Sequence, residues 1–303
     1  MVIRDTRRDE KTDCICMINL YYSEAYWGHS QTMNGPHKVI DNLIKSLEQE
    51  EVDYAINEEK YEHNFLVQYD ATAHEKHSKI EQDTTIIGPQ VWLFDGYGQF
   101  LIQNQNYYKK IIAPSDWVKN KFHTKFKLPE DKVAVWPVGI ETFDNTRNIT
   151  YDCLIYHKRR SDQELDQVKK FLEERNLTHL VLQYGSYDEE GFRHLANQAK
   201  FCFLINGTES QGIAVQEIMS LGVPIIAWDI KTWEDQGPEW SVPATSVPFW
   251  DERCGEKFYD SSEMKKTFDK FYATIDKYNP KEFVKDTLSF ECSVKTLLEI
   301  LES

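Results

Sequence analysis

The chain has 303 residues, of which 41% are hydrophobic and 13% aromatic, a composition typical of a globular protein long enough for two separate cores. Its formal net charge of −15 opposes binding to the phosphate backbone of a nucleic acid, and the sequence contains no extended basic face. These properties predict a two-domain globular protein that does not bind nucleic acid.

The sequence also bears on location and redox state. Residues 1–10 are rich in charge and contain no apolar core of a signal peptide, and no later run approaches the roughly 18 apolar residues of a membrane helix. We therefore expect a cytoplasmic protein without a transmembrane segment. The six cysteines show no C-x-x-C pairing, and four lie in apolar, strand-like runs, which favours reduced thiols over disulfides or a zinc site.

In the first half of the chain, strand patterns alternate with helical ones. Residues 14–22 are expected to form a strand, followed by a long loop to residues 34–36 and an amphipathic helix over 37–49. Pro114 and Ser115 precede a helix over 116–125. A strand is expected to end before Gly88 and Pro89. The remaining strands are expected at 52–56, 64–68, 85–87, 111–113 and 133–138.

The polar segment 139–150 lacks periodicity and is the best candidate for a domain boundary. After it, strands are expected at 152–156, 179–183, 201–205 and 224–228, and helices at 161–175, 188–198, from 212 to 221, 262–278, 281–288 and 293–302. Strands that alternate with helices predict two α/β domains with parallel sheets. The expected domain ranges are 1–145 and 146–280, followed by C-terminal helices at 281–303.

The most informative motif lies between the last two of these strands. Glu209 and Glu217 are eight residues apart around Gly212, and the second lies on a helix that ends at Gly222 before Pro224. The start of such a helix attracts phosphate through its free N–H groups, and carboxylates accept hydrogen bonds from sugar hydroxyls. This geometry indicates a nucleotide-sugar site.

Residues 209–227 resemble the E-x7-E signature of the retaining family 4 glycosyltransferases, which have the GT-B fold of two Rossmann-like α/β domains with parallel sheets facing a central cleft. The resemblance implies that Glu209 reaches the donor sugar and that Glu217 binds the nucleotide ribose. Two glutamates at this spacing also occur by chance in ordinary αβ units. A chance match is much rarer when a glycine also follows the first glutamate by three residues and the helix ends in Gly-x-Pro. Gln211 stands where the family usually has an aromatic residue.

Weaker resemblances cover most of the remaining chain, in the family's order. They concern Gly35 in a glycine loop, residues 111–122 at the end of the first domain, and residues 184–187 beside the nucleotide base. Residues 245–256 also resemble glycosyltransferases of large algal DNA viruses. A plain turn at Gly35 and a core role for the tyrosines are the alternatives. The resemblance implies donor contacts for Gly35, Arg160, Tyr184, Gly185, Ser186, Tyr187, Gln211, Gly212, Ile213, Ala214 and Glu217.

The run His157-Lys158-Arg159-Arg160 is a concentrated basic patch after a predicted strand. Cations at a helix start oppose the helix dipole, so a bound anion explains them better than a solvated surface does. In the family an Arg and a Lys about five residues apart hold the diphosphate, whereas here the cations are contiguous. Lys158 and Arg159, together with Glu209, are the expected catalytic groups, because fixed cations stabilise the leaving diphosphate.

The first domain is expected to bind the acceptor and the second the donor. Trp27, His29, Trp92 and Asp95 are the candidate acceptor contacts, although such aromatics are also ordinary core residues. The expected reaction moves a sugar from a UDP- or GDP-sugar to a hydroxyl of a glycan or glycoconjugate. The sequence has no Asp-x-Asp, which favours transfer without metal or cofactor, and the resemblance implies retention.

Other functions remain open at this stage. A sugar-nucleotide epimerase or a hydrolase of GT-B fold would form product without an acceptor, and a silent nucleotide- or glycan-binding module would leave the donor intact. An NAD-dependent enzyme is disfavoured, because no G-x-G-x-x-G follows the first strand.

Overall fold

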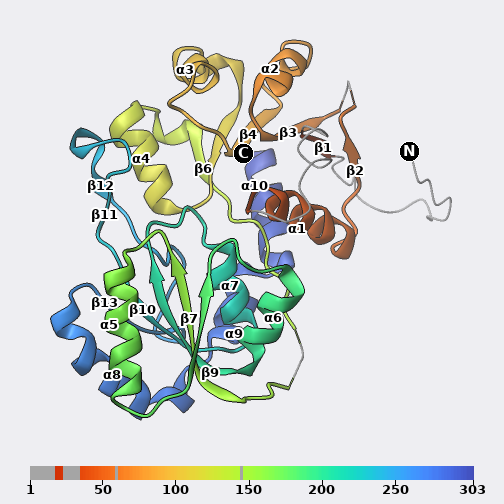
Figure 1. The fold of residues 1–303 in the computed structure, drawn as a ribbon. Coiled ribbons are helices and arrows are strands. Elements are labelled where there is room, and N and C mark those ends of the chain that lie inside the picture. Colours follow the sequence, from red (N-terminus) through yellow and green to blue (C-terminus); the bar gives the residue numbers. More distant parts are fainter. Residues whose placement is uncertain (1–17, 23–34, 59–60, 144–145) are drawn as a thin grey trace. The chain divides into compact units, whose positions relative to one another are not determined.

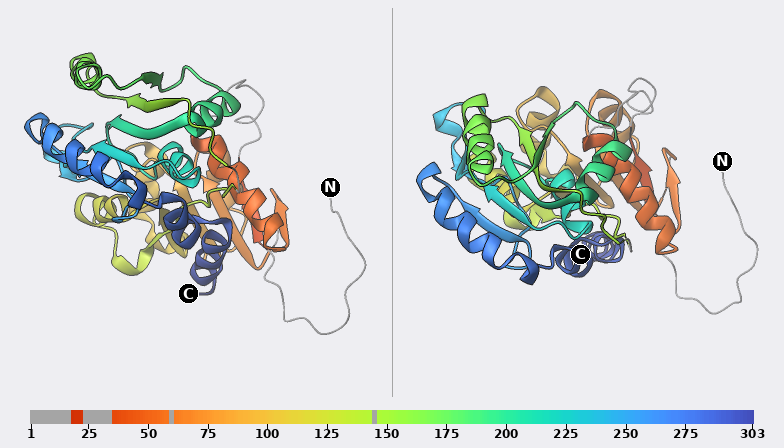
Figure 2. Two further views of the ribbon diagram at one scale, coloured as in Figure 1. Left: turned by 90° about the horizontal axis from the view of Figure 1, so that it is seen from below. Right: turned by 60° about the horizontal axis from the view of Figure 1, so that its bottom comes forward.

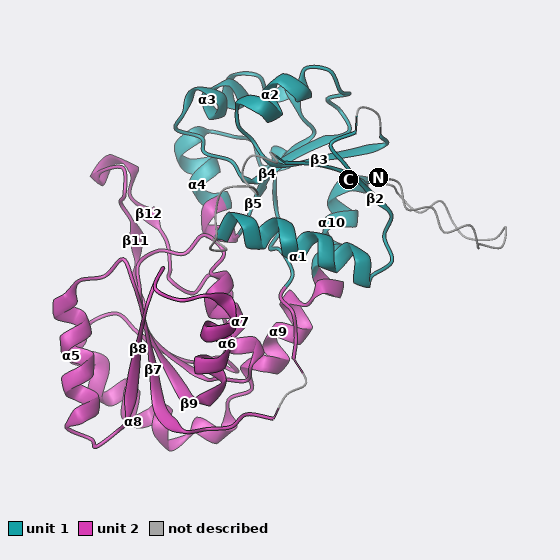
Figure 3. Ribbon diagram, turned by 45° about the vertical axis from the view of Figure 1, so that its right-hand side comes forward, with its two compact units in different colours: residues 1–114, 119–139, 293–303 teal, residues 115–118, 140–292 magenta. Residues whose placement is uncertain are grey.

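The computed structural model describes residues 18–22, 35–58, 61–143 and 146–303 (Figure 1). These residues belong to two compact units (Figure 3). Unit 1 comprises residues 1–114, 119–139 and 293–303, and unit 2 comprises residues 115–118 and 140–292. The main division thus follows residue 139, at the start of the polar segment, whereas the sequence-based division was placed at residue 145. The last eleven residues group with unit 1.

The described part of unit 1 contains a six-stranded parallel sheet in the order β2-β1-β3-β4-β5-β6. Ile18, Leu20, Phe65, Ile86 and Ile111 on its inner strands have no exposed surface. Such continuous apolar burial is typical of a parallel sheet covered on both faces. The strands are β1 (Ile18–Tyr21), β2 (Tyr54–Ile56), β3 (His63–Gln68), β4 (Thr85–Gln90), β5 (Lys110–Ala113) and β6 (Val133–Val135).

Strand β4 differs from the expectation, because it continues through Gly88 and Pro89 instead of breaking there. Gly88 has φ +114°, and a Cβ atom at this position would lie 2.6 Å from the carbonyl oxygen of Ile112. Only glycine leaves room for β5 to pass this close. Gly88 therefore allows β4 to continue at this point.

The helices of the first half are α1 (Gly35–Gln49), α2 (Ala71–His77), α3 (Gly96–Gln103) and α4 (Asp116–Phe126), with 3-10 turns η2 (Gln105–Tyr107) and η3 (Glu130–Lys132). The sequence analysis missed α2 and α3. Helix α2 has only seven residues and depends on the N-cap Asp70, whose side chain accepts from the Ala73 N–H. Helix α3 contains two glycines, and a Cβ on Gly98 would collide with the backbone at Trp92. Glycine content masked its helical pattern.

Unit 2, as far as the structure describes it, contains a five-stranded parallel sheet in the order β13-β10-β9-β7-β8 and a short antiparallel pair, β11 with β12. The strands are β7 (Tyr151–Lys158), β8 (His179–Gln183), β9 (Ala199–Asn206), β10 (Ile225–Trp228), β11 (Thr232–Trp233), β12 (Val242–Pro243) and β13 (Gly255–Phe258). The parallel α/β organisation expected from the sequence is therefore confirmed. Strands β11 to β13 were not anticipated, because they are short and lie in a segment rich in Trp and Pro.

Helices cover both faces of this sheet (Figures 1 and 2). Residues of α5 and α8 share one core with the sheet, including Val168, Phe203 and Phe268. Helices α6, α7 and α9 pack together on the other face. The helices and 3-10 turns of the second half of the chain are α5 (Asp162–Glu173), α6 (Glu189–Gln198), α7 (Ile213–Ser220), η4 (Pro238–Trp240), η5 (Ser261–Glu263), α8 (Met264–Ala273), η6 (Ile275–Lys277), α9 (Pro280–Leu288) and α10 (Phe290–Glu302). Most of α10 belongs to unit 1.

The sequence explains why these helices begin where they do. Ser161 and Glu164 form a capping box at the start of α5, in which each side chain bonds the other residue's backbone N–H. Asn279 caps α9, and Pro280 occupies its first position. Cys153, Cys202 and Cys254 are buried free thiols. Among the described residues, none of the helices combines the length and apolar character needed to span a bilayer.

A buried histidine makes unit 1 sensitive to pH. His77 has no exposed surface, and neither ring nitrogen has a hydrogen-bond partner among the described residues. Its ring packs edge-on against Tyr107 with centroids 4.3 Å apart. Burial, with a smaller contribution from His74, lowers the pKa of His77 from 6.5 to about 4.

We predict that this histidine costs stability in acid. The unfolded chain binds the proton near pH 6.5, whereas the folded chain resists it until about pH 4, so stability is full above pH 6.5 and falls as the pH falls toward 4. The loss approaches about 3 kcal/mol. Urea unfolding of wild type and His77→Phe, which keeps the aromatic packing, measures it. Between pH 6.5 and pH 4, wild type should lose about 3 kcal/mol more stability than His77→Phe, and parallel curves would contradict the prediction.

Candidate functional site

The ends of β7 and β9 bring the predicted site residues together. The two strands pair in parallel so that Lys158 lies opposite Asn206, each at the end of its strand. Chain order also reverses here, because β8 lies on one side of β7 and β9 on the other. Ligands of open parallel sheets bind outside the carboxyl ends of the strands at such a reversal. The basic residue and the E-x7-E segment therefore meet where a ligand is expected.

Glu209 is the centre of this arrangement. Its Oε1 lies 2.7 Å from Lys158 Nζ and accepts a hydrogen bond from Asn206 Nδ2 at 3.2 Å. Only 9% of the residue is exposed. An ion pair with so little solvent holds each charge at a defined position, because leaving either charge unpaired would be costly.

The backbone of Glu209 is also held on both sides. Its N–H donates to the carbonyl of Thr245 at 3.2 Å, and its carbonyl accepts from the indole N–H of Trp117 at 2.8 Å. Both partners belong to unit 2, in which residues 115–118 are included. These contacts give the Glu209 carboxylate a rigid base.

Asn206 was read from the sequence only as part of a turn, and the structure makes it part of the site. It is fully buried, and its Oδ1 has no hydrogen-bond partner among the described residues. Buried amide oxygens normally have a partner. The available signal was its position as the last residue of a buried strand, directly before the motif.

An aromatic side chain covers the ammonium group of Lys158. The Lys158 Nζ lies 4.3 Å from the ring centroid of Tyr184, which is 44% exposed. Tyr184 starts a turn in which Gly185 has φ +85° and the Ser186 hydroxyl bonds the Gln183 carbonyl at 2.6 Å. The exposed ring of Tyr184 offers a flat surface beside a cation.

Tyr187 differs from Tyr184, because its side chain is fixed by the protein. Its hydroxyl lies 2.7 Å from that of Tyr156, and its ring stacks on Phe192. Burial raises the pKa of Tyr187 to about 12 and that of Tyr156 still further. Both phenols therefore stay protonated at neutral pH. Tyr187 anchors the end of the turn that Tyr184 starts.

Helix α7 begins at Gly212, as expected. Gly212 has φ +81°, and a Cβ there would meet only ordinary contacts, so glycine is required by backbone conformation and not by lack of space. Ile213 and Ala214 form the first turn. The Gln211 and Gln216 side chains bond each other, with Gln211 Nε2 donating to Gln216 Oε1 at 3.0 Å. Gln211 thus turns back onto the helix.

Glu217 lies further along α7 and is 9% exposed. Its charge acts on Tyr187, whose pKa it contributes to raising. The motif therefore places one carboxylate before the helix and one on it, with both largely withdrawn from solvent.

The two arginines of the basic run have different environments. Arg160 Nε lies 3.0 Å from both carboxylate oxygens of Glu164, and its Nη1 donates to the carbonyls of Asn206 and Trp228 at 3.2 and 3.1 Å. Arg159 is exposed and has φ +54°. Protein groups thus engage Arg160, whereas the Arg159 side chain extends to the surface.

The predicted acceptor residues that the structure describes lie in unit 1. Trp92 is 49% exposed and packs beside Phe94. Asp95 is the N-cap of α3, where its side chain accepts from the Gly98 N–H at 2.7 Å. Trp27 and His29 lie outside the described residues. Gly35, a predicted donor contact, is the first residue of α1 and has open space where a Cβ would lie.

No group of three or more His, Cys, Asp or Glu side chains suited to a metal occurs within the described ranges.

The contrast between the arginines yields a prediction about stability. Arg160→Gln should destabilise unit 2 by about 2–3 kcal/mol, because Glu164 and two carbonyls would lose a charged donor. Arg159→Gln should change stability by less than about 0.5 kcal/mol, since the side chain is exposed. Urea unfolding of both variants provides the comparison, with Arg159→Gln as the matched control. Equal effects of the two substitutions would refute this assignment.

Neither a protein-family model nor a curated protein matches the sequence. Solved structures share its fold, at low sequence identity. A glycosyltransferase from Rickettsia africae ESF-5 is 10% identical with a TM-score of 0.57, over 95% of this chain and 98% of that one. The apo lipopolysaccharide outer core galactosyltransferase WaaB is 11% identical with a TM-score of 0.56, over 94% and 98% of the chains. The pneumococcal O-GlcNAc transferase GtfA, solved with UDP and GlcNAc, is 12% identical with a TM-score of 0.51, over 79% and 56%. The chain thus has the GT-B fold, with two Rossmann-like α/β domains.

Proposed function

We propose that this chain is a glycosyltransferase that moves a sugar from a nucleotide-diphosphate sugar to a hydroxyl of a glycan or glycoconjugate. The observation that carries the proposal is the Lys158–Glu209 ion pair, at the strand-order reversal of a GT-B domain and directly before the start of α7. The solved structures of this fold named above are glycosyltransferases, and one holds UDP and GlcNAc.

The diphosphate of the donor is assigned to the start of α7. Free N–H groups and the helix dipole favour an anion there, and Gly212 leaves the backbone accessible. Lys158 and Arg159 add positive charge from the end of β7. The base of the donor is assigned to the exposed ring of Tyr184, which lies over Lys158.

The two glutamates divide the remaining contacts. Glu209 accepts hydrogen bonds from the transferred sugar, and Glu217 from the ribose. When the diphosphate binds, it competes with Glu209 for Lys158. Glu209 can then turn to the sugar hydroxyls, so that one ion pair is replaced by two ligand contacts.

The reaction breaks the bond between the anomeric carbon and the diphosphate oxygen and forms a bond to the acceptor oxygen. Negative charge develops on the diphosphate, where Lys158, Arg159 and the helix N–H groups stabilise it without reorganisation. A diphosphate oxygen takes the proton of the acceptor hydroxyl. We propose retention of configuration and no requirement for a metal ion or cofactor, because fixed cations already supply the charge.

A thermal-shift panel of UDP-, GDP- and ADP-sugars tests the donor class. A true donor at 100 times its Kd should add about 2.7 kcal/mol of stability. Incubation of the stabilising donor with and without acceptor glycans, with EDTA in a parallel set, then separates transfer from hydrolysis and tests the metal. Stabilisation by no nucleotide sugar would refute the proposed function.

Substitutions of the two glutamates should have different effects. Glu209→Gln removes the counter-charge of Lys158 and the carboxylate for the sugar, so UDP should bind at least as tightly while transfer falls at least about 100-fold. Glu217→Gln should weaken UDP binding about tenfold, the loss of about one charged hydrogen bond. Calorimetry and product analysis measure the two effects.

Glu190→Gln, an exposed glutamate of α6, is the control and should match wild type in both assays. Parental transfer rates in both site variants would overturn the roles given to Glu209 and Glu217.

A further inference from the structure

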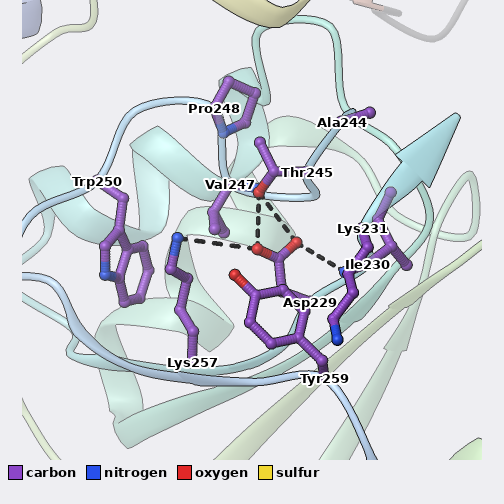
Figure 4. A pocket seen from close by; sticks show the side chains of 10 residues that line it. All are labelled: Asp229, Ile230, Lys231, Ala244, Thr245, Val247, Pro248, Trp250, Lys257 and Tyr259. Carbon is purple, nitrogen blue, oxygen red and sulfur yellow. Dashed lines mark hydrogen bonds and ion pairs between the residues drawn. The ribbon is translucent and has the colours of Figure 1, made fainter. Parts of the chain in front are cut away.

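Unit 2 contains a cavity of about 310 Å³ that the donor site does not use. It opens beyond the carboxyl ends of two other strands, since Asp229 follows β10 and Tyr259 follows β13. In Figure 4, dashed lines join the carboxylate of Asp229 to Thr245, to Lys257 and to the backbone N–H of Ile230. Six of its lining residues matter here: Asp229, Lys231, Thr245, Trp250, Lys257 and Tyr259.

Asp229 builds the inner wall. It is 1% exposed, and its carboxylate accepts hydrogen bonds from the backbone N–H of Ile230, the hydroxyl of Thr245, and both the N–H and the hydroxyl of Ser246, all at 2.7–2.9 Å. With these bonds satisfied, Asp229 fixes residues 245 and 246 in place. It is therefore a structural anchor for the wall.

The same segment supports the donor site. The Thr245 carbonyl accepts the N–H of Glu209, and Pro248 Cδ lies 3.6 Å from where a Cβ on Gly212 would be. Thr245 and Pro248, which line the cavity, thus also lie against Glu209 and Gly212. A group bound in the cavity would lie next to the E-x7-E residues.

The charged groups that line the cavity are Asp229, Lys231 and Lys257. Lys257 Nζ lies 3.8 Å from the carboxylate of Asp229, and Lys231 Nζ lies 5.1 Å from the ring centroid of Tyr259. The two ammonium groups and the Thr245 hydroxyl are hydrogen-bond donors that can bind a polar molecule.

The wall also has two aromatic faces. Tyr259 is 42% exposed with Lys231 Nζ 5.1 Å from its centroid, and Trp250 has Lys257 Nζ 5.7 Å from its centroid. Flat apolar rings beside ammonium donors and the Thr245 hydroxyl match a pyranose, which has apolar ring faces and hydroxyls at its edge. The volume lies at the lower end of small-molecule sites, about 300–1,000 Å³, and fits one sugar ring.

We infer that this cavity binds one pyranose unit of the acceptor saccharide. That the saccharide is an acceptor substrate rests on the proposed function. That the cavity binds a sugar rests only on the residues that line it. Tyr259 and Trp250 supply the platform, and Lys231 and Lys257 donate to ring hydroxyls. The unit would lie next to the position from which the donor sugar is transferred.

Saturation-transfer NMR on the full chain with saturating UDP tests this inference. The probes are the methyl pyranosides of glucose, galactose, mannose, N-acetylglucosamine and glucuronate. At least one of them should bind. Tyr259→Ala and Trp250→Ala should each weaken that pyranoside at least fivefold, while the exposed control Lys266→Met should not.

UDP titration of the same samples separates this inference from the proposed function. The cavity variants should keep the wild-type Kd for UDP, and failure of wild type to bind UDP would count against the donor site alone. The inference is overturned if none of these pyranosides binds, or if binding survives Tyr259→Ala. Tyr259 is exposed, so this test stands even if Trp250→Ala does not fold.

Discussion

The register between β7 and β9 is the constraint on which the candidate site depends. It places Lys158 opposite Asn206, so that the segment leaving β9 brings Glu209 to the ammonium group. A shift of one residue would turn the Lys158 side chain to the opposite face of the sheet. Buried apolar side chains on both faces of the sheet, such as Ile155 on one face and Leu154 on the other, prevent that shift. Core packing therefore determines the geometry of the charges.

A second constraint comes from the buried carboxylates. Glu209 is paired with a cation that a ligand can take over, whereas Asp229 is saturated by hydrogen bonds within its own wall. The ion pair leaves the Glu209 carboxylate able to exchange Lys158 for a ligand. The hydrogen bonds of Asp229 instead fix residues 245 and 246 in place. Glu209 and the cavity are linked through Thr245, which contacts both Asp229 and Glu209. One short segment thus supports both surfaces.

Sequence patterns predicted the larger elements well where periodicity was strong. Strand β8 occurs over the expected residues 179–183, and α7 begins at Gly212 as expected. Short or glycine-containing elements were missed, namely α2, α3 and β11 to β13, because their order comes from caps and neighbours and not from a periodic pattern. The break expected at Gly88 failed for a related reason, since the closeness of Ile112 makes glycine part of the strand.

The sequence by itself determined the α/β class, the two carboxylates around Gly212 and the basic run, because these follow from local patterns of apolar, glycine and charged residues. Only the tertiary structure decided which cations are available. Arg160 is held by Glu164 and two carbonyls, while Lys158 pairs with Glu209 beneath Tyr184. It also revealed Asn206 and the cavity behind Asp229. Except for Glu164, which is four residues from Arg160, those partners are far apart in the chain, and only strand pairing and packing bring them together.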